Sequence, residues 1–90
     1  MKKILEQLLE KNQHKQVYVA IEELSELTKE LTKHLRGDTN IDNITEEIAD
    51  CVIVIETMKL YFGLDQHDVD EVILNKLKCV KERELGVPKK

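Results

Sequence analysis

Apolar residues recur at steps of three and four along most of this chain, which is the spacing of one face of an α-helix. A first short helix is predicted from about Lys2 to Lys11, with an apolar stripe made of Ile4, Leu5, Leu8 and Leu9. A longer helix is predicted from about Gln13 to Arg36, and its stripe consists of Val17, Ile21, Leu24, Leu27, Leu31 and Leu35. Gly37 follows where a left-handed residue would end this second helix.

Two further helices are predicted in the second half of the chain. We expect the third to be capped by Asp42 or Asn43, after the loop GDTNID, and to end near Gly63. The fourth begins after Asp65 and stops before Gly86 and Pro88, with an apolar side formed by Val69, Val72, Ile73, Leu77 and Val80. The sequence therefore predicts an all-α protein, folded as a single domain over residues 1–90.

The run from Cys51 to Ile55 offers an alternative, because its β-branched residues favour a strand on propensity alone. Strong helix formers flank this run, and no second strand candidate exists to pair with it. A helix that is apolar nearly all round is the better interpretation, and such a helix needs cover on two sides. We expect its own chain to cover one side and a partner subunit the other.

Chain length and composition also favour a helical protein that forms an oligomer. A chain of 90 residues buries only about 60–65% of the surface that its unfolded form exposes. Its composition, 41% hydrophobic and 36% charged with one proline, suits a helical protein rather than a disordered tail. These features predict a homo-oligomer, in which four-helix protomers form a helical-bundle dimer or tetramer.

Charge and hydropathy exclude several classes of partner. The net charge is -4 and the basic residues are scattered, so a nucleic acid polymer is not an expected partner. No apolar stretch approaches the roughly 20 residues of a membrane span, and the N-terminal segment is a short amphipathic helix rather than a signal peptide. Cys51 and Cys79 stand apart without metal-ligand spacing, which predicts two free thiols in a cytoplasmic protein.

Acidic residues border the apolar stripes of the second and third helices. Glu47 falls within the apolar arc of the third helix, Asp50 lies at its edge, and Glu23 and Glu26 form a similar pair on the second helix. Residues three apart lie on one helical face, and an unpaired buried carboxylate is costly. If the two helices pack antiparallel, the four carboxylates converge on a hard cation such as Mg²⁺, which bridges substrate phosphates.

Surface charge is the competing interpretation, since such acidic spacings are common on solvated helices. We expect a solvated face of this kind at Lys29, Glu30 and Lys33. The acids that follow Asp65 are explained by the favourable position of negative charge at a helix N-terminus.

The pattern Glu22-Glu23-Leu-Ser-Glu26, followed after twenty residues by Glu47-Ile-Ala-Asp50, resembles the EExxE…ExxD signature of the all-α nucleoside triphosphate pyrophosphohydrolases. This superfamily contains the MazG-like proteins and their dimeric dUTPase and dCTPase relatives. The resemblance covers most of the chain, including the loop between the two motifs and the fourth helix. It implies hydrolysis of a nucleoside triphosphate to the monophosphate and pyrophosphate, in nucleotide-pool house-cleaning.

The resemblance also implies roles for individual residues. Mg²⁺, or alternatively Mn²⁺, would be held by the residues matching the motif, which are Glu23, Glu26, Glu47 and Asp50. Glu22 would support these ligands or orient the attacking water. Lys76 and Arg83 on the fourth helix would bind phosphate, and Lys76 would also assist catalysis by offsetting charge on the leaving pyrophosphate.

One position departs from the family pattern. Many relatives carry an Asn three residues before the matching Arg, where this chain has Val80, so part of the phosphate or sugar contact is lost or comes from Asn75. Two alternatives to an enzyme therefore remain: a non-enzymatic helical oligomerisation module, and a metal-binding homologue without hydrolytic activity. The sequence does not identify the base or the sugar of a substrate.

Overall fold

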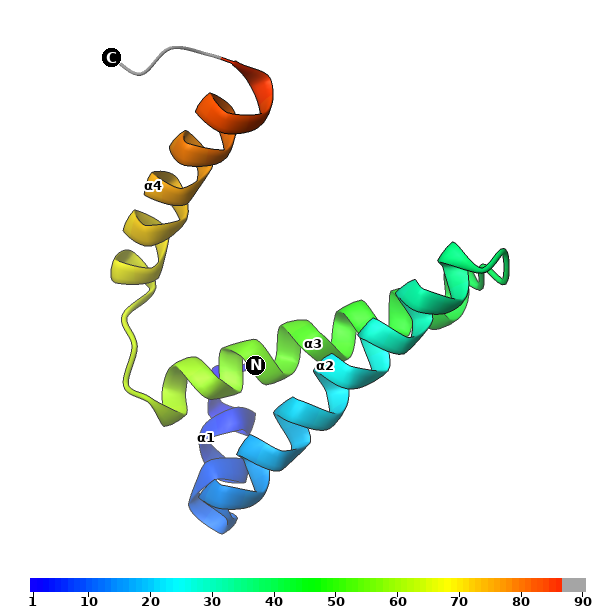
Figure 1. Cartoon of the computed structure of the whole chain (residues 1–90). Helices are drawn as coiled ribbons and strands as arrows, with labels where there is room; N and C mark the ends of the chain where they lie inside the picture. Colours follow the sequence, from blue (N-terminus) through cyan, green and yellow to red (C-terminus); the bar gives the residue numbers. More distant parts are fainter. Residues whose placement is uncertain (87–90) are drawn as a thin grey trace.

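Four α-helices make up the computed structural model of the chain, which describes residues 1–86 (Figure 1). Their bounds are α1 Lys2–Lys11, α2 Gln13–Leu35, α3 Ile41–Tyr61 and α4 Gln66–Leu85. The all-α prediction is confirmed, and residues 51–55 are helical rather than extended. Helix α4 stops before Gly86 as expected, while Pro88 lies outside the described residues.

Polar residues with the expected capping chemistry begin three of these helices. The side chain of Asn12 accepts a hydrogen bond from the Lys15 amide at 3.1 Å at the start of α2. Asp65 caps α4 by accepting from the His67 amide at 2.9 Å. Asn40 caps α3 by accepting from the Asn43 amide at 3.0 Å.

The predicted cap of α3, Asp42 or Asn43, is wrong. The helix begins at Ile41, so both residues lie inside its first turn, where Asp42 faces the positive end of the helix dipole. Asn40 takes the capping role because its backbone is extended and its side chain reaches the free amide of Asn43. Gly37 ends the preceding turn with φ of +91°, a left-handed conformation that glycine adopts without strain.

Helices α2 and α3 form a long antiparallel hairpin, and α1 folds back against one end of it (Figure 1). The buried apolar residues all lie in these three helices and are Leu5, Leu9, Ala20, Cys51 and Val54. Thr57 is also buried, and its hydroxyl is satisfied because it donates to the Ile53 carbonyl at 2.8 Å. The core of the protomer is therefore a narrow seam between α2 and α3, closed at one end by α1.

Helix α4 stands apart from this core. It projects away from the hairpin in Figure 1, packs against none of the other helices over any length, and contains no buried residue. The radius of gyration is 16.5 Å, against about 12 Å for a compact chain of this length. The accessible surface is 7422 Å², which is roughly 2000 Å² more than a compact monomer of this mass exposes.

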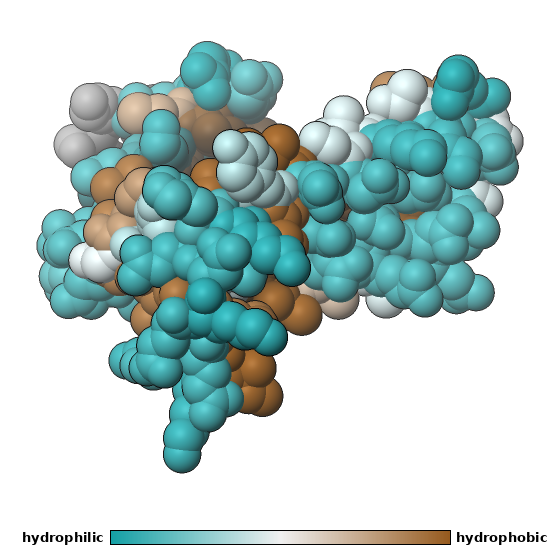
Figure 2. All heavy atoms as spheres, turned by 90° about the horizontal axis from the view of Figure 1, so that it is seen from below, coloured by the Kyte–Doolittle hydropathy of each residue, from teal (hydrophilic) through white to brown (hydrophobic). Residues whose placement is uncertain are grey.

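Much of this extra surface is apolar. Figure 2 shows hydrophobic side chains reaching the surface near the middle of the molecule, whereas the loop end of the hairpin is mostly hydrophilic. Exposed apolar residues occur on both long helices of the hairpin, and on α4 they are Val72, Ile73, Leu74, Leu77, Val80 and Leu85. The helical stripes predicted from the sequence are thus present, but most of their residues are exposed in the single chain.

Over residues 1–86, no helix is both long and apolar enough to cross a lipid bilayer. Both cysteines are free thiols as predicted, Cys51 buried and Cys79 exposed.

Candidate metal centre

Three carboxylates from two helices meet on the α2–α3 seam. Glu23 comes from α2, whereas Glu47 and Asp50 come from successive turns of α3. Each of the three offers an oxygen atom within 4.8 Å of the other two, and all three side chains are half-buried. The antiparallel hairpin therefore brings together acids that stand more than twenty residues apart in the sequence.

A tertiary hydrogen bond fixes the two helices at this level. The thiol of Cys51, which follows Asp50 on α3, donates to the main-chain carbonyl of Glu23 on α2 at 3.4 Å. Cys51 is only 4% exposed, so the contact lies in the close-packed part of the seam. It holds the backbone of Glu23 against the turn that carries Asp50.

The electrostatics of the cluster are those of crowded like charges. Partial burial, followed by the charge of Asp50 and a side-chain hydrogen bond with it, raises the pKa of Glu23 above its ordinary value. Partial burial, followed by the charge of Asp50, likewise raises the pKa of Glu47. Glu26, Glu30 and Glu46 add smaller repulsive contributions at Glu47. Both carboxyls therefore hold a proton more tightly than free glutamate, or require a cation nearby.

One oxygen of the cluster has no partner among the described residues. Glu47 Oε2 is buried and receives no hydrogen bond. A buried acceptor without a partner is destabilising, because it has lost water and gained nothing in return. A divalent cation bound by the three carboxylates would supply the missing contact. Carboxylate oxygens are the ligands that Mg²⁺ and Mn²⁺ prefer, so this donor set fits the predicted metal.

The other two acids of the EExxE motif lie at the margin of this group. Glu26 is exposed and is not among the three converging carboxylates, although it is near enough for its charge to act on Glu47. Glu22 is also exposed, and its charge acts on Glu23. The structure thus brings three of the four predicted metal ligands together, with Glu26 and Glu22 beside them.

The predicted phosphate-binding residues are not part of the cluster within one protomer. Lys76 and Arg83 are exposed on α4, which does not pack against the hairpin (Figure 1). The Arg83 Nε atom lies 3.5 Å from a carboxylate oxygen of its neighbour Glu84. Val80, the departure from the family pattern, lies on the same helix and is also exposed.

Glu30 is a residue that sequence reasoning placed wrongly. We expected it on a solvated face, but it is buried, with 7% of its surface exposed, and it pairs with Lys33 at 3.4 Å. The signal was available, because Glu30 stands seven residues after Glu23 and therefore lies on the same face of α2. This part-buried ion pair brings the ammonium group of Lys33 close to the carboxylate cluster, since the charge of Glu30 acts on Glu47.

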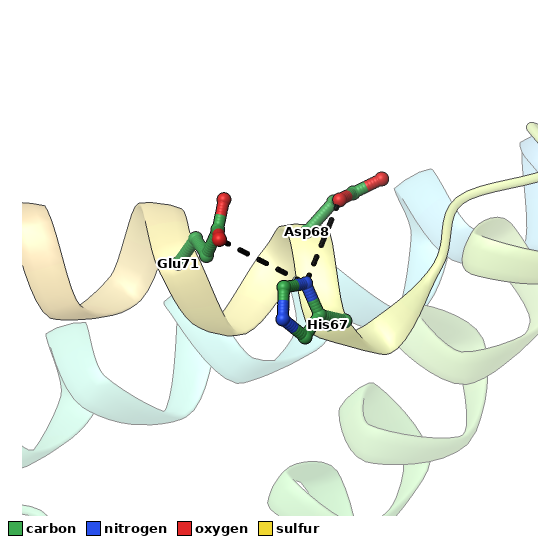
Figure 3. Close-up of side chains that lie close together, drawn as sticks. All are labelled: His67, Asp68 and Glu71. Atoms are coloured by element: carbon green, nitrogen blue, oxygen red, sulfur yellow. Dashed lines mark ion pairs between the residues drawn. The ribbon is translucent and has the colours of Figure 1, made fainter.

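A second group of potential ligands lies on the first turn of α4 (Figure 3). His67 Nδ1 is 3.9 Å from Asp68 Oδ1 and 3.9 Å from Glu71 Oε1, and all three side chains are exposed. These contacts are within one helix and open to water, where ion pairs contribute little. Acids at a helix N-terminus account for the arrangement, as the sequence indicated.

Family models, curated proteins and solved structures were compared with the chain. None of them matches it. The resemblance to the all-α nucleoside triphosphate pyrophosphohydrolases therefore depends on the residues of the two acidic motifs.

Proposed function

We propose that this protein is a Mg²⁺-dependent nucleoside triphosphate pyrophosphohydrolase, with Mn²⁺ as an alternative ion. The observation that carries the proposal is the buried, unpartnered Glu47 Oε2 among three converging carboxylates. A solvated acidic surface does not explain it, because exposed acids find water as their partner. A cation site does, and a divalent cation held by these carboxylates would also suit a phosphate substrate.

Glu23, Glu47 and Asp50 would hold the ion on the seam. When bound, such an ion neutralises charge on the triphosphate and lowers the pKa of a bound water. Glu22, exposed beside Glu23, would support these ligands or orient the water that attacks the α-phosphorus. The proton of that water would pass to a carboxylate of the site or to solvent. The bond between the α-phosphorus and the bridging oxygen breaks, giving a nucleoside monophosphate and pyrophosphate.

Lys76 and Arg83 would serve this reaction only in an assembly. The protomer exposes roughly 2000 Å² more surface than a compact monomer, which is the scale that each copy buries in a large obligate interface. Docking of α4 against a second copy would cover its apolar residues and allow the two basic side chains to approach the carboxylates of that copy. The proposed enzyme is therefore a homo-oligomer, either a dimer or a tetramer.

A non-enzymatic oligomerisation module is the second candidate, and the uncovered apolar residues of α4 favour it. Oligomerisation would explain why α4 exposes apolar residues. It would not explain why three carboxylates converge on the α2–α3 seam. A metal-binding homologue that does not hydrolyse nucleotides is the third, and Val80 favours it because an amide contact to substrate is missing there.

One experiment separates these candidates. The protein is incubated with Mg²⁺ and a panel of nucleoside triphosphates that includes dUTP, dCTP and oxidatively damaged nucleotides, and the products are separated. Release of pyrophosphate and monophosphate in equal amounts supports the proposal. Absence of release from every nucleotide contradicts it, and release of orthophosphate would show that a different bond is broken.

A further inference from the structure

We propose that Cys51 sets the separation of α2 and α3 at the carboxylate cluster, and thereby makes the site selective for Mg²⁺ over the larger Ca²⁺. This inference rests on the metal-binding part of the proposed function. It assigns a specificity-determining role to a residue outside the two acidic motifs.

The position of Cys51 links it to the ligands on both helices. On α3 it directly follows Asp50 and comes one turn after Glu47. Across the seam its sulfur lies 3.4 Å from the carbonyl oxygen of Glu23, the residue that supplies the carboxylate from α2. One buried side chain thus contacts the backbone of one ligand and adjoins the other two along the helix.

The separation of the helices controls the geometry of the cluster because the ligands are divided between them. Glu47 and Asp50 move together with α3, whereas Glu23 moves with α2. The seam is narrow here, since Cys51 and Ala20, one turn before Glu23, are both small and buried. A bulkier, branched side chain at position 51 would crowd the backbone of α2 near Glu23 and push that helix outward, because close-packed interiors do not absorb extra volume.

The size of the preferred cation follows from this separation. Mg²⁺ requires near-octahedral coordination with oxygen at 2.0–2.1 Å, whereas Ca²⁺ accepts irregular coordination at 2.3–2.6 Å. Widening the seam therefore weakens Mg²⁺ binding more than Ca²⁺ binding. The compact thiol, which also donates a hydrogen bond to α2, keeps the carboxylates close enough for the smaller ion.

The test compares cation affinities of the whole chain without nucleotide, using calorimetric titration with Mg²⁺ and with Ca²⁺. In Cys51→Val, we expect the ratio of Mg²⁺ affinity to Ca²⁺ affinity to fall by roughly 10-fold or more, a size typical of changes in the residues that support metal ligands. Cys51→Ser keeps both the small size and a donor, so it should retain the wild-type ratio. Val54→Ile adds bulk to the same seam one turn further along α3. It should lower the melting temperature without changing the ratio.

Three results would overturn the inference. The first is an unchanged ratio in Cys51→Val with a helical circular dichroism spectrum. If that variant does not fold, Cys51→Thr adds a methyl group and keeps a donor, and an unchanged ratio there counts equally. The second is an equal fall in the ratio for Val54→Ile, which would show a general packing effect. The third is a wild-type protein that binds neither cation, which would overturn the metal site as well, whereas binding with an unchanged ratio overturns only the role of Cys51.

Discussion

Helices α2 and α3 of the hairpin and helix α4 have similar lengths and similarly spaced apolar residues, but they differ in how much of their surface is buried. In the hairpin, a narrow seam buries Ala20, Cys51 and Val54 and carries three half-buried carboxylates. Helix α4 buries nothing, and its ion pairs lie in water. Partial burial in this seam is the largest cause of the raised pKa values of Glu23 and Glu47.

The two regions also differ in which of their groups lack a partner within the chain. Among the described residues, the buried side-chain atom of the hairpin without a hydrogen-bond partner is Glu47 Oε2, which the proposed cation would satisfy. Helix α4 has a capped N-terminus but exposes its apolar residues, which the proposed assembly would cover. Three experiments test these two requirements separately.

The largest effect is expected from Asp50→Asn, which alters only the hairpin. It removes a charge from the carboxylate cluster while keeping the shape of the side chain. Without Mg²⁺ the variant should be as stable as the wild type or more stable, because repulsion with Glu23 and Glu47 is reduced. The rise in melting temperature on adding Mg²⁺ should largely disappear, and pyrophosphate release should fall by more than the roughly 10–100-fold typical of residues that only support metal ligands.

Asp42→Asn is the matched control for this change. It removes a carboxylate from the first turn of the same helix, away from the cluster. Its Mg²⁺ response and turnover should be those of the wild type. Near-normal Mg²⁺ stabilisation in Asp50→Asn would contradict the metal site.

The next effect concerns α4 alone. Leu77 is 56% exposed in the protomer, and if α4 docks on a second copy, Leu77→Glu places a charge in the interface. Losing the burial of one leucine costs about 1.5–3 kcal/mol of association free energy. In a two-fold symmetric interface the same leucine of each copy is changed, so this loss occurs twice. The dissociation constant should rise by at least about 100-fold, as measured by sedimentation over a range of concentrations.

Asn75→Glu introduces the same carboxylate two residues earlier without removing apolar surface, and it should dissociate the assembly much less. The Mg²⁺ response of the separated Leu77→Glu protomer should persist, since the carboxylates belong to the hairpin. A wild-type protein that sediments as a stable folded monomer at micromolar concentration would refute the assembly.

The smallest effect is the pH dependence of the metal-free hairpin, because solvent screens half-buried charges. The pKa values of Glu23 and Glu47 are raised above the ordinary 4.5 in the folded state, so the folded protein binds protons more tightly than the unfolded chain. Stability is therefore greatest below about pH 4.5 as far as these two groups decide it, and it declines as the pH rises through their raised pKa values. Melting curves in a chelator across this range measure the decline.

Added Mg²⁺ should reverse the decline at neutral pH, and Glu47→Gln should flatten it in the absence of metal. A metal-free melting temperature that rises steadily with pH, and is unaffected by Glu47→Gln, would show that repulsion among the three carboxylates does not destabilise the folded protein.

Patterns among residues close together in the sequence were enough to predict the helices. Spacing of apolar residues located all four, and the turn residues Gly37 and Asp65 fixed two of the boundaries. The cap of α3 was missed because Asn40, Asp42 and Asn43 all have capping chemistry, and the choice depends on backbone conformation that the sequence does not specify.

The candidate site was predictable to the extent that it depends on helical spacing. Glu47 and Asp50 were placed correctly beside the apolar arc, and Glu23 faces them because the hairpin is antiparallel. Spacing places Glu30 on the same face of α2 as Glu23, a signal that the prediction overlooked. How deeply Glu30 is buried, and the bond between Cys51 and the Glu23 backbone, depend on how closely the two helices approach, which spacing does not give. Lys76 and Arg83 were expected beside the carboxylates, but they lie on α4, which does not pack against the hairpin. Their approach to the site would require the assembly that we propose, and sequence spacing within one chain does not describe such contacts.

The isolation of α4 also determines the order of events in folding. The contact between Cys51 and Glu23 closes a loop of only 28 residues, and contacts between neighbouring helices form on microsecond to millisecond timescales. If α4 docks on another copy, as proposed, that step requires a collision between two chains, so its rate would depend on protein concentration. In dilute solution, chains with a finished hairpin and an uncovered α4 should accumulate first, and the exposed leucines and valines of that helix are where they would aggregate.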